Sequence, residues 1–245
     1  MSGTGGPVHR YAEARGRILT LAARRVPLAS IAQQARALSL WDGKRVTPGD
    51  ELQLALVLDL GVLDPLGGHG RGIDRQARAD PPPPGSDEAL MLAALLDAAF
   101  GLYRLRGAHP EGGAAAEGFP GGGPVHIRDD HLGRQPPGRL FGARLAWPED
   151  GLAMTCGAVV PVDSRVLERL LLGLPPTRGP VTPRLPAPEE DEAAVAAILE
   201  EPAARARLAA LPRTPGFAAL CYRAAIDLGL LGPVPGREPP PPPGA

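Results

Sequence analysis

Glycine and proline constrain the fold of this chain more than any other feature of its sequence. The 245 residues include 32 glycines and 31 prolines, a share close to that of low-complexity segments. They are clustered, however, and the apolar residues between the clusters keep regular spacing. Aromatic residues make up only 4% of the chain, so a core must be built mainly from Leu, Ala and Val. The sequence therefore predicts folded pieces separated by irregular connections.

Apolar residues at helical spacing predict a helical domain over residues 10–99. Thr47 followed by Pro48 is a typical start signal for one of its helices, and Ser86 is a typical N-cap for another. The preceding residues, 1–9, are glycine-rich and are predicted to be disordered.

Beyond this domain the spacing changes to the alternation that is typical of strands. The glycine-rich stretch 107–123 is predicted to be a loop that is disordered in part. Asp163 is predicted to cap a helix that closes a β-rich module of residues 100–173. The strands are predicted at residues 102–106, 125–127, 140–147 and 152–160.

A proline-rich segment at residues 174–188 predicts a linker, which is followed by a C-terminal helical segment at 189–231 and a disordered proline-rich tail at 232–245. The last helix is predicted to begin at Thr214. The predicted fold class is α+β and mainly helical: an N-terminal helical bundle, then a small antiparallel β module, then C-terminal helices. Because the C-terminal helices are short, we expect them to dock on the main body or on a partner.

The balance of charge argues against several classes of protein. The chain has 26 basic and 27 acidic residues, so bulk charge does not steer it towards nucleic acid. Its one lysine, Lys44, stands against 25 arginines, and asparagine is absent. Codon supply in a GC-rich genome would produce this bias, so the arginines are weak evidence for a ligand. Without a signal-peptide pattern or an apolar block long enough for a membrane, the sequence predicts a cytoplasmic protein with no membrane partner.

Cys156 and Cys221 are the only cysteines, and both lie in apolar runs. Two cysteines cannot form a disulfide framework or a cysteine-rich zinc site, whereas free cysteine packs like a small hydrophobic residue. We therefore expect two inert, buried thiols. The sequence contains neither a Gly-x-Ser-x-Gly nor a His-Glu-x-x-His motif, and no cofactor is predicted.

Two histidines and two aspartates lie within six residues: His126, Asp129, Asp130 and His131. Imidazole nitrogens and carboxylate oxygens are ligands that zinc or manganese accept. A metal-dependent enzyme built on this cluster is therefore one hypothesis. The alternative is an ordinary turn, because consecutive aspartates followed by Gly133 are typical of hairpin connections.

Arginines and aromatic residues are interleaved in the predicted strands. Proteins that bind single-stranded nucleic acid use this combination to neutralise the backbone and to stack on bases. The alternative is a solvated outer face of the sheet. The residues concerned are Tyr103, Arg104, Arg106, Arg128, Arg139, Arg144 and Trp147.

Two parts of the chain resemble a known group of proteins. Residues 50–65 and 73–75 are similar to the helical front of uncharacterised proteins from GC-rich, mainly alphaproteobacterial, genomes. Residues 137–145 and 154–158 resemble the short β module that follows, which also occurs in some proteins with a SEC-C zinc-binding tail. This sequence lacks that cysteine-containing tail, so the resemblance implies no metal. Over residues 10–172 it implies a helical part followed by a β module, and no particular activity.

The hypothesis that these observations favour is a non-catalytic protein–protein interaction or regulatory protein of the cytoplasm. A protein partner or a homo-oligomer is expected. Abundant leucine-rich helical surface and flexible connections support this hypothesis. Nucleic-acid binding and metal-dependent catalysis are the alternatives.

Overall fold

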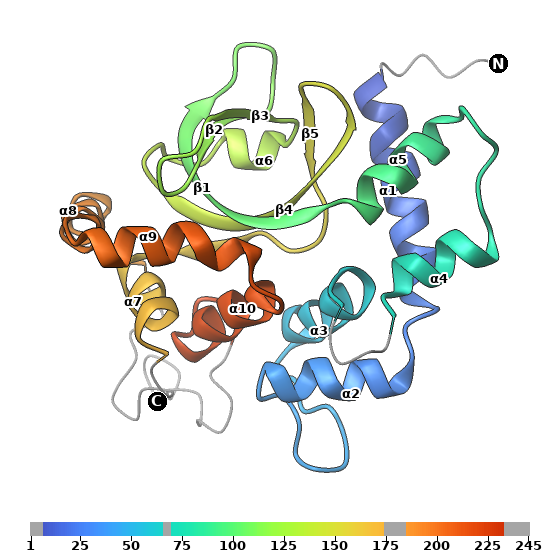
Figure 1. Ribbon diagram of the computed structural model, residues 1–245, viewed down its shortest axis with the longest axis horizontal. Helices are drawn as coiled ribbons and strands as arrows, with labels where there is room; N and C mark the ends of the chain where they lie inside the picture. The colour runs from blue at the N-terminus through green and yellow to red at the C-terminus, as the bar shows by residue number, and fades with distance from the viewer. Residues whose placement is uncertain (1–6, 66–69, 174–184, 233–245) are drawn as a thin grey trace, which may run out of the picture.

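The computed structural model of the chain describes residues 7–65, 70–173 and 185–232 (Figure 1). Three predicted segments lie mostly outside these residues: the disordered N-terminus (1–9), the linker (174–188) and the tail (232–245). Where they overlap, α1 begins at Pro7, inside the N-terminus predicted to be disordered, and α8 begins at Pro188, the last residue of the predicted linker.

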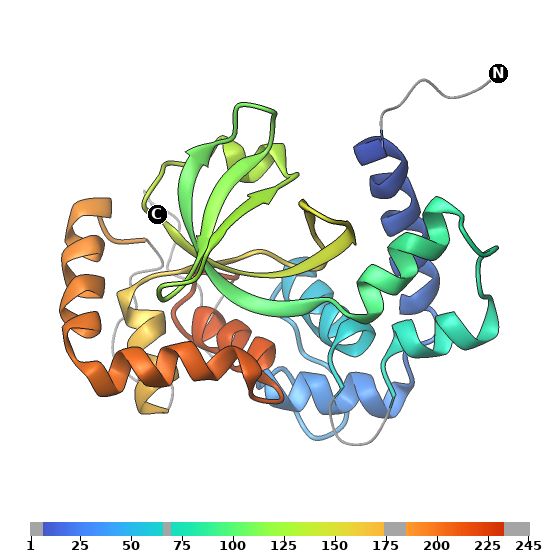
Figure 2. The ribbon, with the colours of Figure 1, turned by 45° about the horizontal axis from the view of Figure 1, so that its top comes forward.

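Five strands form a closed barrel, which Figure 2 shows standing above the surrounding helices. The strand order is β1-β2-β3-β5-β4-β6, and the additional pairing of β1 with β4 closes the ring. The sixth strand, β6, pairs with β4 outside the ring. The strands are β1 (Ala99–Ala108), β2 (Ala114–Gly118), β3 (Pro124–Ile127), β4 (Leu140–Glu149), β5 (Leu152–Thr155) and β6 (Val160–Val162).

The barrel differs from the predicted small antiparallel module. One of its pairings, between β3 and β5, is parallel and joins Ile127 to Ala153. Closure depends on the ten-residue length of β1, which pairs with β4 over residues 99–104 and with β2 over residues 103–108. The sequence predicted only the middle of this strand and could not show that it has two partners.

The predicted loop at 107–123 contains strand β2, so that prediction was wrong. Alanine and glycine have little preference for strands, so the residue types here do not predict one. Pairing with β1 on one edge and β3 on the other overrides that weak preference. Gly113 makes the tight entry possible, because it has a φ of 77° and a Cβ at this position would collide with the Ile127 carbonyl.

A short helix, α6 (Asp130–Gly133), joins β3 to β4 where a hairpin turn was the alternative prediction. Its Leu132 is buried with the residues that fill the barrel. A five-stranded barrel in this order, with a helix between the third and fourth strands, is an OB-fold architecture. That architecture supports many functions and does not by itself identify one. The barrel interior consists of Leu105, Ala114, Ala116, Ile127, Leu132, Phe141, Ala143, Leu145 and Ala153.

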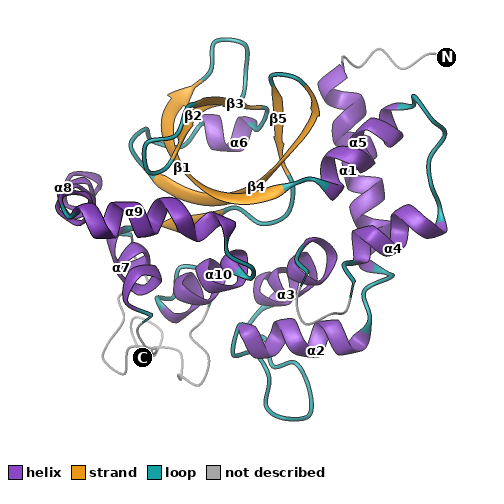
Figure 3. Cartoon of the chain, viewed as in Figure 1, coloured by secondary structure: helices purple, strands orange, loops and turns teal. Residues whose placement is uncertain are grey.

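The helices pack around the barrel in two groups (Figure 3). The first shares a core with residues of β4 and β5 and comprises α1 (Pro7–Ala23), α4 (Gly72–Ala79) and α5 (Asp87–Leu96). The second packs beside β1, β4 and β6 and comprises α2 (Leu28–Ala37), α3 (Glu51–Leu63), α7 (Ser164–Leu172), α8 (Pro188–Glu200), α9 (Pro202–Ala210) and α10 (Phe217–Asp227). The N-terminal helices are therefore shared between two cores and do not form the separate bundle that was predicted. No helix in the described ranges has the length and hydrophobicity needed to cross a membrane.

The C-terminal helix α10 is an integral part of the second core. Its Phe217 and Tyr222 both meet the ring of Phe100 from β1 edge to face, with centroids 5.8 Å and 5.6 Å apart. It also contacts α2, α3 and α7. The C-terminal segment thus docks on the main body.

Side-chain caps explain where several helices begin. The predicted caps Ser86 and Asp163 are confirmed, since each accepts a hydrogen bond from a backbone amide in the first turn of its helix. The predicted cap Thr47 is wrong: α3 begins three residues later, where Asp50 accepts from the Gln53 amide at 2.9 Å. The Gln53 side chain accepts in return from the Gly49 amide. This reciprocal arrangement satisfies two amides at once, which favours the later start.

The last helix also begins later than predicted, at Phe217 instead of Thr214. A short 3₁₀ helix (Leu211–Arg213) precedes it, and the Thr214 hydroxyl donates to the Leu211 carbonyl there. The sequence did not predict α9, which starts with a proline at its first position.

We expect Leu132→Ala to lower the free energy of unfolding by about 2–5 kcal/mol, because the substitution empties space at the buried end of the barrel. Leu172→Ala is the matched control, since that leucine also lies in a helix but is 67% exposed. Its expected cost is below about 0.5 kcal/mol. Urea unfolding followed by circular dichroism measures both, and equal costs would contradict this account of the barrel.

Candidate functional site

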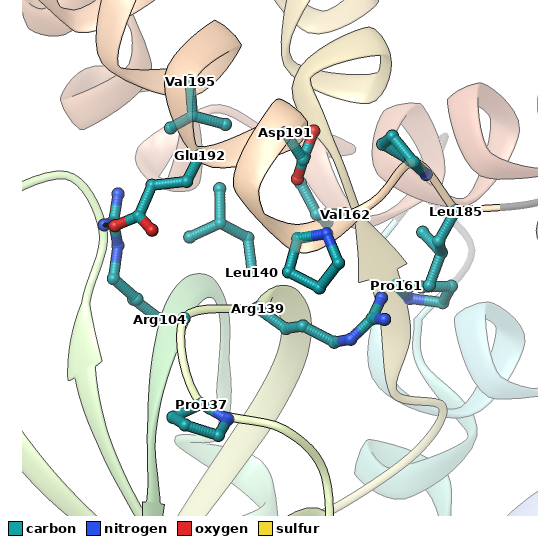
Figure 4. A pocket seen from close by; sticks show the side chains of 13 residues that line it. Arg104, Pro137, Arg139, Leu140, Pro161, Val162, Leu185, Asp191, Glu192 and Val195 are labelled. Carbon is teal, nitrogen blue, oxygen red and sulfur yellow. Dashed lines mark ion pairs between the residues drawn. The ribbon is translucent and has the colours of Figure 1, made fainter.

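A cleft lies between the barrel and α8 (Figure 4). The barrel contributes Arg104 of β1, the segment 137–140 and Pro161 of β6, and the other wall is the start of α8. Arg104 and Glu192 face one another across it with 3.7 Å between nitrogen and oxygen. Its volume is about 70 Å³, so it is narrow.

A larger cavity of about 540 Å³ adjoins this cleft at the α6 end of the barrel. The two share Arg139, Leu140, Pro161 and Leu185 in their walls. Most of the lining of the larger cavity is apolar, and its floor includes residues of the barrel interior. The remaining lining residues are Leu105, His131, Leu132, Gln135, Pro136, Phe141 and Val159.

Arg139 gives the larger cavity its charge. Its backbone carbonyl accepts from the Leu105 amide at 2.9 Å, which fixes the position of the residue directly before β4. Within the described ranges its guanidinium forms no ion pair. In Figure 4 its side chain extends towards Pro161 and Leu185. Among the described residues no acid lines this cavity, although Asp191 and Glu192 line the adjoining cleft. On the cavity side Arg139 therefore favours an anion.

Four of the five arginines that the sequence suggested for nucleic acid, all except Arg139, are paired with acids. Arg104 contacts Glu192, and its guanidinium lies 5.4 Å from the centre of the Phe119 ring. Arg144 is only 5% exposed and pairs with Asp64 at 3.1 Å. The remaining pairs are Arg106 with Glu117 and Arg128 with Glu111.

The two aromatic residues of the same set lie in different surroundings. Tyr103 stacks on Phe141 with 5.6 Å between ring centroids and packs against the barrel interior, and burial raises its pKa to about 12. Trp147 of β4 is 47% exposed. The structure therefore leaves Trp147 accessible, whereas Arg144 is buried; nucleic-acid binding stays a prediction.

The structure does not gather the four residues of the predicted metal cluster around one point. Asp129 caps α6, where one oxygen accepts from the amides of His131 and Leu132 and the other from the Thr155 hydroxyl at 2.8 Å. Asp130 accepts from the Gly113 amide at 3.0 Å. Both aspartates thus hold the α6 connection against the barrel.

His126 instead lies beside His109 and Glu111, two residues that the sequence reasoning missed. Their ligand atoms all lie within 4.8 Å of one another. The separation of His109 and His126 by sixteen intervening residues gave no spacing signal, and both missed residues fell in a stretch interpreted as a loop. Only the pairing of β2 with β3, which sets Ala115 opposite His126, brings them together.

A second polar cluster joins α3, α10 and the connection between β5 and β6. Although Asp59 is partly exposed as a residue, its carboxylate packs against the backbone of Gly157 and accepts from Tyr222 Oη at 2.5 Å. Burial raises the pKa of Asp59 to about 6, against the opposing effects of the Tyr222 hydrogen bond and the charge of Arg144. Gly157 has a φ of 88° and no room for a Cβ, so this contact requires glycine.

Comparison with protein-family models, with curated proteins and with solved structures finds no match for this chain. The resemblance to uncharacterised proteins of GC-rich genomes stays a prediction.

Asp59 leads to a prediction about pH. Because its pKa is higher in the folded protein than the ordinary value of 3.8, folding favours its protonated form, and its contribution to stability is lost as the pH rises through 6. We expect Asp59→Asn to gain about 2 kcal/mol relative to the wild type between pH 4 and pH 7. Urea titrations of both proteins across this range measure the difference. Parallel stability curves would contradict the raised pKa.

Proposed function

We propose that this chain is a non-catalytic interaction protein that holds a short segment of a partner protein in the cavity beside Arg139. The observation that carries the proposal is the combination of an apolar cavity of about 540 Å³ with Arg139, beside which the described part of the lining contains no acid. A volume of this size is typical of sites that hold a small ligand or a few side chains.

The walls indicate the chemistry of the bound segment. Leu132, Phe141 and Val159 offer apolar surface that a leucine-like or aromatic side chain would cover. A carboxylate on the same segment would pair with the planar guanidinium of Arg139, which suits two parallel hydrogen bonds. The preferred partner segment therefore combines an apolar side chain with an acidic one.

The rim of the cavity is rigid, which favours binding because little conformational entropy is lost. Pro136 and Pro161 line the cavity and Pro137 lines the adjoining cleft, and each proline has a fixed φ. Arg139 directly precedes β4, and its carbonyl accepts from the Leu105 amide of β1. A site with such a rigid rim loses less conformational entropy on binding than a flexible loop would.

The state of the thiols also favours binding over cysteine-dependent chemistry. Cys156 and Cys221 are both buried, and burial raises the pKa of each to about 12. The thiolate is the nucleophilic form, and neither residue forms it at neutral pH.

A pair of hexapeptides tests the proposal: one alternates leucine with glutamate, and the other has glutamine in place of glutamate. We expect the glutamate peptide to bind at least about tenfold more tightly, because only it can pair with Arg139. Arg139→Ala should abolish this difference, whereas the matched control Arg134→Ala should keep it, since Arg134 is exposed on the same connection and outside the cavity lining. Fluorescence anisotropy measures the affinities. A preference that survives in Arg139→Ala, or no binding of either peptide, would refute the proposal.

Nucleic-acid binding is the second candidate, and the barrel architecture is the observation that favours it. Barrels of this kind bind oligonucleotides through the second and third strands and the neighbouring loops. In this chain the outer positions of those strands include Glu117, whose negative charge opposes such a ligand, beside Arg106.

Salt dependence tests this second candidate directly. If single-stranded DNA binds along the paired arginines, the affinity of the protein for a labelled oligothymidine should fall by about tenfold or more between 50 and 200 mM salt. Arg106→Ala should weaken binding, while Arg24→Ala on the distant α1–α2 connection should not. An affinity that does not change with salt would dismiss this candidate.

A further inference from the structure

His109, Glu111 and His126 converge on one side of the barrel from two different elements. His109 and Glu111 follow β1 in the loop that leads to β2, and His126 lies in the middle of β3. Each can offer one ligand atom, and these atoms lie within 4.8 Å of one another. Both histidines are half-buried, whereas Glu111 is exposed to solvent. The cluster is therefore held by the barrel and open to an incoming ion.

The hydrogen bond of His126 defines which of its nitrogens is free. Its Nε2 lies 2.7 Å from the carbonyl oxygen of Gly112. Because a carbonyl only accepts, Nε2 must carry the proton, and the lone pair is left on Nδ1. Histidines that bind metals commonly donate their second nitrogen to a backbone carbonyl in this way, which fixes the ring and its tautomer.

The second imidazole lies close enough to share an ion with the first. The rings of His109 and His126 are stacked with 3.4 Å between centroids and 20° between planes. Two nitrogens bound to one tetrahedral zinc ion, each at about 2.1 Å, are roughly 3.4 Å apart, and the ligand atoms here already lie within 4.8 Å of one another. Because lone pairs lie in the ring planes, the His109 ring must turn out of the stack on binding. Its contact with the Glu111 amide, 3.2 Å from Nδ1, is long and exposed, so little opposes that turn.

The carboxylate of Glu111 supplies the third ligand and has a competitor. Arg128 reaches it with 3.2 Å between nitrogen and oxygen and also donates to the Glu111 backbone carbonyl at 2.6 Å. The carboxylate is exposed, and exposed ion pairs contribute little to stability. A divalent ion can therefore displace the guanidinium from the carboxylate, while the backbone contact keeps the loop in place.

We propose that His109, Glu111 and His126 bind a divalent transition-metal ion, with zinc as the principal candidate. Two imidazoles and one carboxylate suit zinc, nickel or cobalt and disfavour magnesium and calcium, which prefer oxygen ligands. Three protein ligands leave one position of a tetrahedral ion for water. The site is independent of the cavity beside Arg139, and it excludes Asp129, Asp130 and His131, whose contacts serve α6 or lie elsewhere.

Titration of the purified full chain with zinc chloride against a fluorescent chelator tests the site. We expect one ion per chain, and His109→Ala and His126→Ala should each weaken binding by about a hundredfold. His131→Ala is the matched control, because this histidine lies near His126 in the sequence but outside the cluster; it should leave the affinity unchanged. Magnesium chloride should not compete at the same concentrations.

Arg128→Gln separates binding at this site from nonspecific effects, because it should raise the zinc affinity by releasing the Glu111 carboxylate. Cobalt added to the wild type should give the visible absorption of a tetrahedral complex, and this absorption should be absent from His126→Ala. Circular dichroism confirms that the variants are folded. Loss of zinc binding in His131→Ala, equal zinc affinity in His126→Ala and the wild type, or no binding by the wild type would each overturn the proposal.

Discussion

The pairing of β1 with β4 is the constraint on which the rest of the structure depends. It runs from Ala99 opposite Leu145 to Arg104 opposite Leu140 and converts a row of strands into a closed ring. Closure removes the open edges that a small sheet would otherwise expose. It also brings Phe100 over Gly142, where a Cβ would lie 2.7 Å from the ring and could not fit. The aromatic ring of Phe100 is also the surface on which Phe217 and Tyr222 of α10 pack.

Buried charges then orient the helices on this barrel. Arg144 of β4 pairs with Asp64 beyond α3 and donates to the Ala98 carbonyl before β1, so one side chain joins three segments. Arg169 of α7 pairs with Asp227 at the end of α10 in the same way. Buried pairs of this kind add little net stability, but removing one partner leaves a charge without compensation. We infer that their main effect is to exclude other arrangements of the same apolar surfaces.

Much of the secondary structure followed from the sequence because local physics decides it. The helices capped by Ser86 and Asp163 and the strands around Leu105 and Leu145 have clear apolar spacing. Strand β2 has no such apolar spacing, and its alanines adopt a strand because β2 pairs with β1 and β3. Barrel closure likewise depends on contacts between residues about forty positions apart, which spacing along the chain does not reveal.

The sites were harder to predict than the fold for a related reason. Adjacency in the sequence suggested that His126, Asp129 and Asp130 act together, but a strand followed by a capped helix directs them to different partners. The sequence likewise suggested arginines that are free to bind nucleic acid, whereas the structure pairs four of them with acidic side chains. What a charged side chain can do depends on its neighbours in space, and these are set by the barrel.

The burial of both thiols has a practical consequence for physical studies of this protein. Cys156 and Cys221 lie in separate cores and stay protonated at any pH used for maleimide chemistry. A cysteine introduced at an exposed position, such as that of Leu172 or Trp147, would therefore react alone. Spin labels or fluorophores could then report distances within the native chain without first removing its own cysteines.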